Sequence, residues 1–143
     1  MQKTWVVAAE STRAKIYQLS SKTSPLQEIE DLIHTSGREK ILDLEADRPG
    51  RAFDSVGGGR HALGKEVDSK EHEALVFAKI LVDRIEQGRT ATEFTDLILI
   101  APPEFMGHFK KTLNSQLLKL VSKTLTKNLV RENESVIRDH LFE

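Results

Sequence analysis

The chain has 143 residues, no cysteine, and a nearly balanced charge of 21 Lys and Arg against 22 Asp and Glu. This length is typical of a single domain with its own apolar core. The absence of cysteine excludes disulfides, thiol nucleophiles and cysteine-ligated zinc. Because the charges balance, no global field attracts nucleic acid or membrane, and any site for a polyanion must be a local patch.

The start of the chain does not have the pattern of an export signal. Its first apolar run is residues 5–9, whereas a signal peptide needs a longer apolar core and a small-residue cleavage site. No stretch approaches the roughly 20 apolar residues of a membrane span. We therefore predict one cytoplasmic domain over residues 1–143, with no membrane partner.

Three strands are predicted in the first part of the chain. Residues 4–9 are apolar and partly β-branched, which indicates a buried strand, and residues 14–19 alternate with a period of two. Residues 26–33 form a less regular third strand, because Glu and Asp are poor strand formers. The link 10–13 is short enough for a hairpin, so these strands predict an antiparallel meander.

Helices and strands alternate in the second part. Asp68 with Glu71 resembles a capping box, which marks the start of a helix, and Gly88 is a natural C-terminal stop. We therefore predict a helix from Asp68 to Gly88. The nearly continuous apolar stretch 94–101 predicts a central strand covered on both faces. The other predicted elements are a short helix at 37–45, a helix at 102–113, a helical turn and then a strand at 121–126 within 115–126, and a helix at 132–141.

This order, β-β-β-α-β-α-β-α, predicts an α/β fold with RNase-H-like connectivity. Three meander strands followed by right-handed crossovers give a mixed five-stranded sheet with helices on both faces. The predicted core consists of Val6, Val7, Ile16, Leu75, Ala78, Leu81, Leu97, Ile98, Leu99 and Ile100.

A metal nuclease is the first function to consider, since this fold often hosts one. Two-metal catalysis needs several converging carboxylates, but the middle of the first strand carries none. Glu10 lies at the end of that strand, and Asp96 lies early in the fourth, at the opposite edge of the sheet. No two histidines have the i,i+4 spacing of a helical metal site. We predict no metal, no cofactor and no catalytic residue, and we interpret all histidines except His61 as surface residues.

Residues 47–65 are the most informative stretch. Four glycines and a proline within 47–61 favour a flexible loop. Glycine lets backbone N–H groups approach an anion closely, and arginine binds phosphate with two hydrogen bonds. The predicted RNA-binding residues are Arg48, Arg51, Arg60, His61 and Lys65. The loop also contains Phe53, which could stack on a base, together with Asp54, Ser55, Gly57, Gly58 and Gly59. An exposed connector with chance charges is the alternative.

Several motifs resemble one known family, the bacterial host attachment proteins, over essentially the whole chain. The most specific motif is Asp-Arg-Pro-Gly-Arg-Ala-Phe-Asp-Ser at 47–55. The others are the opening Trp-Val-Val-Ala-Ala-Glu-Ser-Thr-Arg-Ala-Lys-Ile-Tyr, Gly-Arg-His-Ala at 59–62, Phe77-Ala78, Pro-Pro-Glu-Phe-Met-Gly at 102–107, and Lys127-Asn128-Leu129.

This family is in turn similar to the middle domain of class 1 peptide-release factors and of the Pelota rescue factor. Release factors place a Gly-Gly-Gln loop, just before a helix with a Phe-Ala pair, in the peptidyl-transferase centre to assist peptidyl-tRNA hydrolysis. Here Gly57-Gly58-Gly59 occupies a comparable place without the glutamine, which Pelota-type factors also lack. The resemblance implies a non-catalytic domain whose partner is the ribosome or tRNA.

Two alternatives remain open. The family name implies a protein-interaction domain in surface attachment, with another protein as its partner. A weak hydrolase acting on RNA or peptidyl-tRNA would use His61 as a base near Ser55 or Asp54, which requires the loop to fold back on itself.

Overall fold

The computed structural model describes residues 3–34 and 58–142, and for residues 58–68 it describes the backbone. These residues form five strands and four helices. In chain order they are β1 (Thr4–Ala9), β2 (Arg13–Leu19), β3 (Gln27–Ile33), α2 (Gly58–Thr90), β4 (Asp96–Ile100), α3 (Pro103–Thr112), α4 (Ser115–Leu120), β5 (Val121–Leu125) and α5 (Glu134–Leu141). The predicted helix at 37–45 lies outside the described residues.

The five strands form one mixed sheet in the order β3-β2-β1-β4-β5. The first three strands are the predicted antiparallel meander. Strands β1, β4 and β5 run parallel to one another, joined by helical crossovers. The predicted mixed five-stranded sheet is therefore confirmed, and so is the change from helix to strand near Val121.

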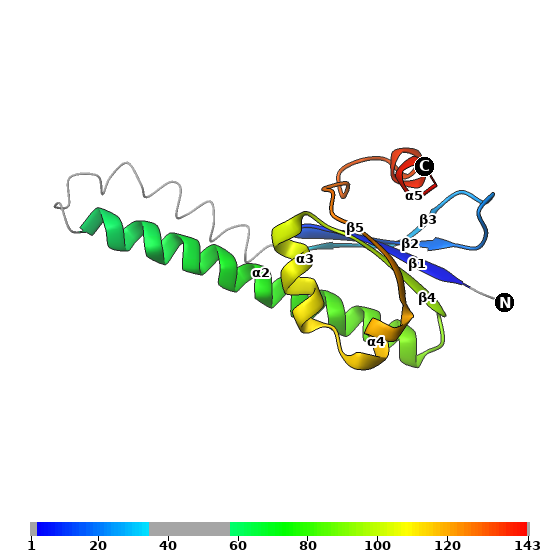
Figure 1. Ribbon diagram of the computed structural model, residues 1–143, viewed down its shortest axis with the longest axis horizontal. Helices are drawn as coiled ribbons and strands as arrows, with labels where there is room; N and C mark the ends of the chain where they lie inside the picture. Colours follow the sequence, from blue (N-terminus) through cyan, green and yellow to red (C-terminus); the bar gives the residue numbers. More distant parts are fainter. Residues whose placement is uncertain (1–2, 35–57, 143) are drawn as a thin grey trace.

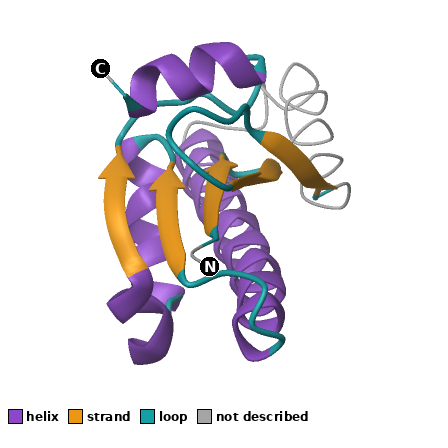
Figure 2. Ribbon diagram, turned by 90° about the vertical axis from the view of Figure 1, so that its right-hand side faces the viewer, coloured by secondary structure: helices purple, strands orange, loops and turns teal. Residues whose placement is uncertain are grey.

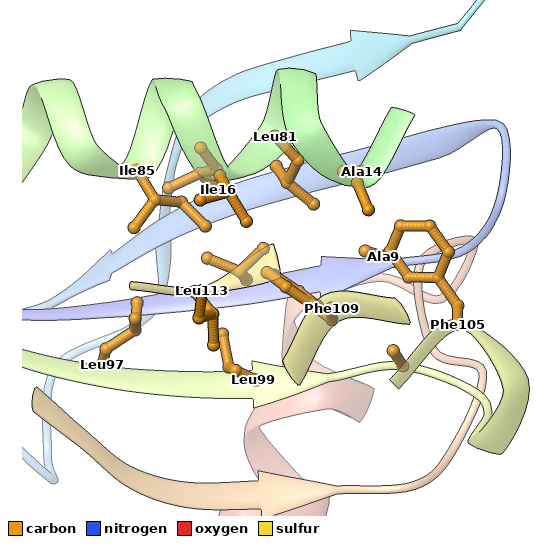
Figure 3. Packing of buried hydrophobic residues seen from close by; sticks show 14 of the residues in the cluster. Ala9, Ala14, Ile16, Leu81, Ile85, Leu97, Leu99, Phe105, Phe109 and Leu113 are labelled. Carbon is orange, nitrogen blue, oxygen red and sulfur yellow. The ribbon is translucent and has the colours of Figure 1, made fainter. Parts of the chain in front are cut away.

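Helices cover both faces of the sheet (Figures 1 and 2). Alternate residues of the central strands point to opposite sides, as the period of a strand requires. Leu97 and Leu99 join the core under α2, α3 and α4, whereas Ile98 and Ile100 join a second core under α5. Figure 3 shows the first core, with Ile16, Leu81 and Ile85 packed between α2 and the sheet. The prediction of a central strand buried on both faces is confirmed.

Leu75 is the exception among the ten predicted core residues. Its side chain is 39% exposed, while the other nine are buried. Phe77, which the prediction omitted, is buried instead. Phe77 follows Ala74 by three residues and precedes Leu81 by four, so all three share one face of the helix. Leu75 is rotated by about 100° from Ala74, which turns it toward solvent.

Helix α2 begins at Gly58, ten residues before the predicted start at Asp68. The prediction of a loop through residue 65 is therefore wrong for 58–65. A helix that is already formed gains one hydrogen bond for each residue it adds, so extension is favourable once nucleation is complete. Good helix formers such as Arg60, Ala62 and Leu63 compensate for the glycines, which cost about 1 kcal/mol each relative to alanine. None of the helices in the described ranges has the length and apolarity to cross a membrane.

Gly88 does not end α2, contrary to the prediction. The helix continues to Thr90, and the residue with a left-handed backbone is Thr92, with φ of 58°. A Cβ atom at Gly88 would lie 2.4 Å from Cη2 of Trp5 and 2.7 Å from its Cζ3. Gly88 is thus the place where the helix backbone rests directly on the Trp5 ring. This ring also packs against Phe94 in a tilted arrangement, with 4.6 Å between the ring centroids.

The surroundings of two helical glycines predict opposite effects of alanine on the free energy of unfolding. Gly88→Ala should lower the free energy of unfolding by about 1–3 kcal/mol, because the added methyl group overlaps the buried Trp5 ring. Gly107→Ala in α3 should raise it by about 0.5–1 kcal/mol, because a Cβ there meets nothing within 4 Å. Urea denaturation of both variants checks the pair. A Gly88→Ala variant as stable as Gly107→Ala would contradict the described packing.

Tyr17 lies in the second core with only 2% of its surface exposed. Burial disfavours the phenolate, and the nearby carboxylates of Glu28 and Glu134 add to this effect. Together they raise the pKa of Tyr17 from 10.0 to about 12. The folded state therefore holds the phenol proton more tightly than the unfolded chain does.

The raised pKa predicts a loss of stability at high pH. The contribution of Tyr17 is fully present below the unfolded pKa of 10.0 and declines as the pH rises toward the folded pKa of about 12. Tyr17 is the only tyrosine in the chain, so phenolate absorbance reports its titration directly. We expect a midpoint near 12 in the native protein and near 10 in denaturant. Tyr17→Phe should show a smaller loss of stability between these pH values, and equal midpoints would contradict the burial.

Candidate functional site

An open groove lies at the carboxyl ends of the parallel strands. The chain leaves β1, β4 and β5 at this end of the sheet, and ligands of open α/β sheets generally bind outside such carboxyl ends. The groove has a volume of about 910 Å³. Its floor and walls come from Glu10, Ser11, Lys70, Glu71, Ala74, Pro102, Pro103, Glu104, Phe105, Gly107, His108, Lys111 and Asn128.

Helix α3 forms one wall of the groove because its two faces differ. Pro102 and Pro103 end the extension of β4, and proline suits the first turn of a helix. Phe105, Met106 and Phe109 then point into the core. The opposite face carries residues at the i, i+3, i+4 and i+7 spacing of a helix, namely Glu104, Gly107, His108 and Lys111, and these line the groove.

Glu10 holds two connections of the chain together at the groove floor. Its carboxylate accepts hydrogen bonds from Asn128 and from Arg131, both at 3.3 Å, and from Thr12 at 3.4 Å. The carboxylate thereby joins the β1–β2 turn to the segment that follows β5. Its lone pairs are used within the protein, which favours a structural role over metal binding.

Asp96 lies at the opposite edge from Glu10, as the sequence analysis expected. It is the first residue of β4 and pairs in register with Thr4, the first residue of β1. Its carboxylate accepts a hydrogen bond from Ser122 at 2.9 Å. Where side chains are described, in residues 3–34 and 69–142, no three His, Asp or Glu residues gather in a group that could hold a metal ion.

His34 and Glu73 form a buried pair that the sequence analysis missed. Nε2 of His34 lies 2.8 Å from Oε2 of Glu73, and the two residues are only 8% and 5% exposed. The His34 ring also stacks on Phe77 with 5.4 Å between ring centres. The prediction of a surface histidine is therefore wrong. His34 directly follows β3, so this pair ties the end of that strand to the middle of α2.

Residues 58–69 of α2 form an arm that extends beyond the sheet (Figure 1). The whole helix has 33 residues, which corresponds to about 50 Å. The arm includes five predicted site residues, Gly58, Gly59, Arg60, His61 and Lys65, which lie in its first turns rather than in a loop. The other predicted site residues, Arg48, Arg51, Phe53, Asp54, Ser55 and Gly57, lie outside the described residues.

Helix α2 connects the groove to the arm. Lys70 and Glu71 line the groove, and the arm runs from them toward Gly58. The first turn of α2 contains no acidic residue that would offset the positive pole at a helix N-terminus. The groove residues Lys70, His108 and Lys111 were not predicted from the sequence. For His108 and Lys111, the helical spacing within the predicted helix at 102–113, directly after a predicted parallel strand, is the signal that could have found them.

Comparison with known proteins shows a family, a protein sequence and a solved structure to which this chain is similar. The family model described as "Protein required for attachment to host cells" matches residues 5–141. An uncharacterized protein of Rickettsia prowazekii (strain Madrid E) is 29% identical over 113 residues, which is 76% of this chain and 69% of that protein. A solved structure titled "Archaeal protein" is similar over 98% of this chain, with 16% identity and a TM-score of 0.39. This chain spans only 36% of the length of that archaeal protein.

The match to the family model covers nearly the whole chain, including all five strands and α2, α3, α4 and α5. The chain therefore belongs to the family of proteins described as required for attachment to host cells.

Proposed function

We propose that this protein is a non-catalytic RNA- or ribosome-associated binding domain that contacts RNA through the arm of α2. The observation that carries this proposal is the projection of the arm beyond the sheet with Gly58, Gly59 and Arg60 in its first turn. The first N–H groups of a helix have no partner within the helix, and they sit at its positive pole. Such an end favours a phosphate group.

The fold adds support at the level of analogy. We infer an RNase-H-like fold from the strand order β3-β2-β1-β4-β5 with an antiparallel meander and two parallel crossovers. We also infer a relation to the middle domain of release factors, in which a glycine-rich tip precedes a helix with a Phe-Ala pair. In this chain Phe77 and Ala78 are both buried against the sheet in α2, the helix that begins with Gly58 and Gly59. The pair would anchor the helix while its other end reaches the partner.

The groove extends the proposed contact. Lys70 of α2 and Lys111 of α3 line the two walls of the groove at the base of the arm. A nucleic acid strand that follows the arm toward the sheet would therefore meet further cations. Lysine binds phosphate as a point charge without reading base identity. The expected binding is accordingly strong at low salt and weak in sequence preference.

The proposed contact between the arm and RNA predicts the behaviour of a double variant. Arg60→Ala with Lys65→Ala should weaken ribosome and RNA binding and flatten the dependence of affinity on salt by about 0.7–1 for each removed cation. The free energy of unfolding should change by less than about 0.5 kcal/mol, as is usual for substitutions away from a core. Co-sedimentation with ribosomes at several salt concentrations measures the first effect, and urea denaturation the second.

A matched control separates the arm from net charge. Lys3→Ala with Lys79→Ala removes the same charge at exposed positions away from the arm, so it should bind as the unaltered protein does. Failure of the unaltered protein to bind ribosomes or tRNA at any salt concentration would end the proposal. Hydrolysis of RNA or peptidyl-tRNA that is lost in His61→Ala would show that the domain is a hydrolase.

The family description favours a second candidate, a protein-interaction domain in attachment to host cells. The affinity of contacts between two proteins depends less on salt than the affinity of contacts with phosphate. This candidate therefore predicts a protein partner that stays bound at high salt after isolation from cells. Recovery of ribosomal components alone, released as the salt concentration rises, would count against it.

A further inference from the structure

One long segment of the chain carries positive charge without any acidic residue. From Phe105 to Arg131 there are five lysines, one arginine and no Asp or Glu. The whole chain has 21 basic and 22 acidic residues, so the remainder carries 15 and 22. The charges are thus balanced in total but segregated along the sequence. This segment forms most of α3, all of α4 and β5, and the connection toward α5.

These cations lie on both faces of the β5 side of the sheet. Lys110, Lys111 and Lys119 belong to α3 and α4 on one face, whereas Lys123 and Lys127 contact α5 on the other. Strand β5 is the outermost strand of the sheet, and α3 and α4 precede it directly in the chain. In Figure 1, α3, α4 and β5 lie next to one another. We call this surface the basic edge. Its cations are Lys110, Lys111, Lys119, Lys123, Lys127 and Arg131.

Within the described residues, few of these cations are neutralised by the protein itself. Arg131 pairs with Glu10 at 3.3 Å and is 68% exposed. Lys123 donates to the backbone oxygen of Leu141 at 2.7 Å, and Lys127 lies 3.2 Å from Nδ1 of His140. Among the side chains that the structure describes, in residues 3–34 and 69–142, no carboxylate forms an ion pair with any of the five lysines.

Two acids beside this segment already have partners. Asp96 accepts the hydrogen bond from Ser122, and Glu86 accepts one from Asn114 at 2.6 Å. Hydrogen bonds from Arg89 and Asn114 lower the pKa of Glu86. Both carboxylates are thereby held by groups other than the lysines.

Protection of an exposed strand edge is the simpler explanation for some of these lysines. Lysine on an edge strand discourages pairing with another chain, and this could account for Lys123 and Lys127 on and just after β5. It does not account for Lys110, Lys111 and Lys119, because they lie on α3 and α4. A helix has no unpaired strand edge to protect.

We propose that the basic edge binds the phosphodiester backbone of RNA, as a second contact surface separate from the arm. The choice of RNA as the polyanion rests on the proposed function. The two phenylalanines of this segment, Phe105 and Phe109, are buried, so they are not available to stack on bases. The contact is therefore with phosphates and independent of sequence. An anionic membrane fits less well, because Leu118 is the sole large apolar side chain exposed on the described basic edge.

The test compares three variants with the unaltered protein, using poly(U) RNA and fluorescence anisotropy at several salt concentrations. The edge variant is Lys110→Gln with Lys119→Gln and Lys127→Gln. The control variant is Lys3→Gln with Lys22→Gln and Lys79→Gln, which removes the same charge elsewhere. The arm variant is Arg60→Ala with Lys65→Ala. The edge variant should reduce the salt slope by about 2, at about 0.7 for each phosphate contact, and weaken binding at least tenfold at low salt. The control variant should change neither value.

The outcomes separate this inference from the proposed function. Edge and control variants that bind alike, while the arm variant binds weakly, would overturn the basic edge and leave the arm in place. A weakened edge variant beside an unchanged arm variant would support the edge and remove the arm from the site. No binding of poly(U) or ribosomes by the unaltered protein would overturn both.

Two further measurements identify other roles for the same lysines. Sedimentation velocity detects self-association, and an edge variant that self-associates but binds RNA like the control would assign the lysines to edge protection alone. Vesicles of phosphatidylserine test the membrane. Vesicle binding that is lost in the edge variant, with RNA binding unchanged, would replace the RNA contact with a lipid contact.

Discussion

The close contact between α2 and the sheet at Gly88 and Trp5 is the constraint on which the remaining architecture depends. The missing side chain lets the helix backbone lie against a fully buried ring. Ile85, Leu81 and Phe77 then continue the same buried face toward the N-terminus of the helix. A helix fixed along this line keeps its direction past the end of the sheet, so the packing of the C-terminal half sets where the arm points.

The two candidate surfaces use different parts of this framework and meet at Lys111, which lines the groove and belongs to the basic edge. The arm and the groove lie where β1, β4 and β5 end, next to the connection that Glu10 fastens with Asn128 and Arg131. The basic edge lies along β5 and the helices before it. Both would act on phosphate through point charges, and neither needs a metal or a catalytic group. A domain with two such surfaces could be held in one orientation on a large RNA, with the arm directed toward a specific place.

Hydrophobic periodicity predicted the strands and most helices. A helix or strand with one buried face repeats apolar residues at its own period, and this repeat is visible in the sequence. The alternation in 14–19 and the apolar run in 94–101 correspond to β2 and β4. Predictions failed where a distant residue decides the outcome. Trp5 gives Gly88 its role, and Glu73 turns His34 from a surface residue into a buried one. The start of α2 at Gly58 was missed because glycine suggests a loop, whereas the helix behind it favours extension.

The most direct test of the account is site-specific cross-linking from the tip of the arm. The chain has no cysteine, so a single cysteine at His61 can carry a photoactivatable cross-linker without a competing thiol. A cysteine at Thr90, the last residue of the same helix, is the matched control. With intact ribosomes, we predict adducts to ribosomal RNA from position 61 and none from position 90. Equal adducts from both positions, or adducts from position 61 to proteins alone, would contradict it.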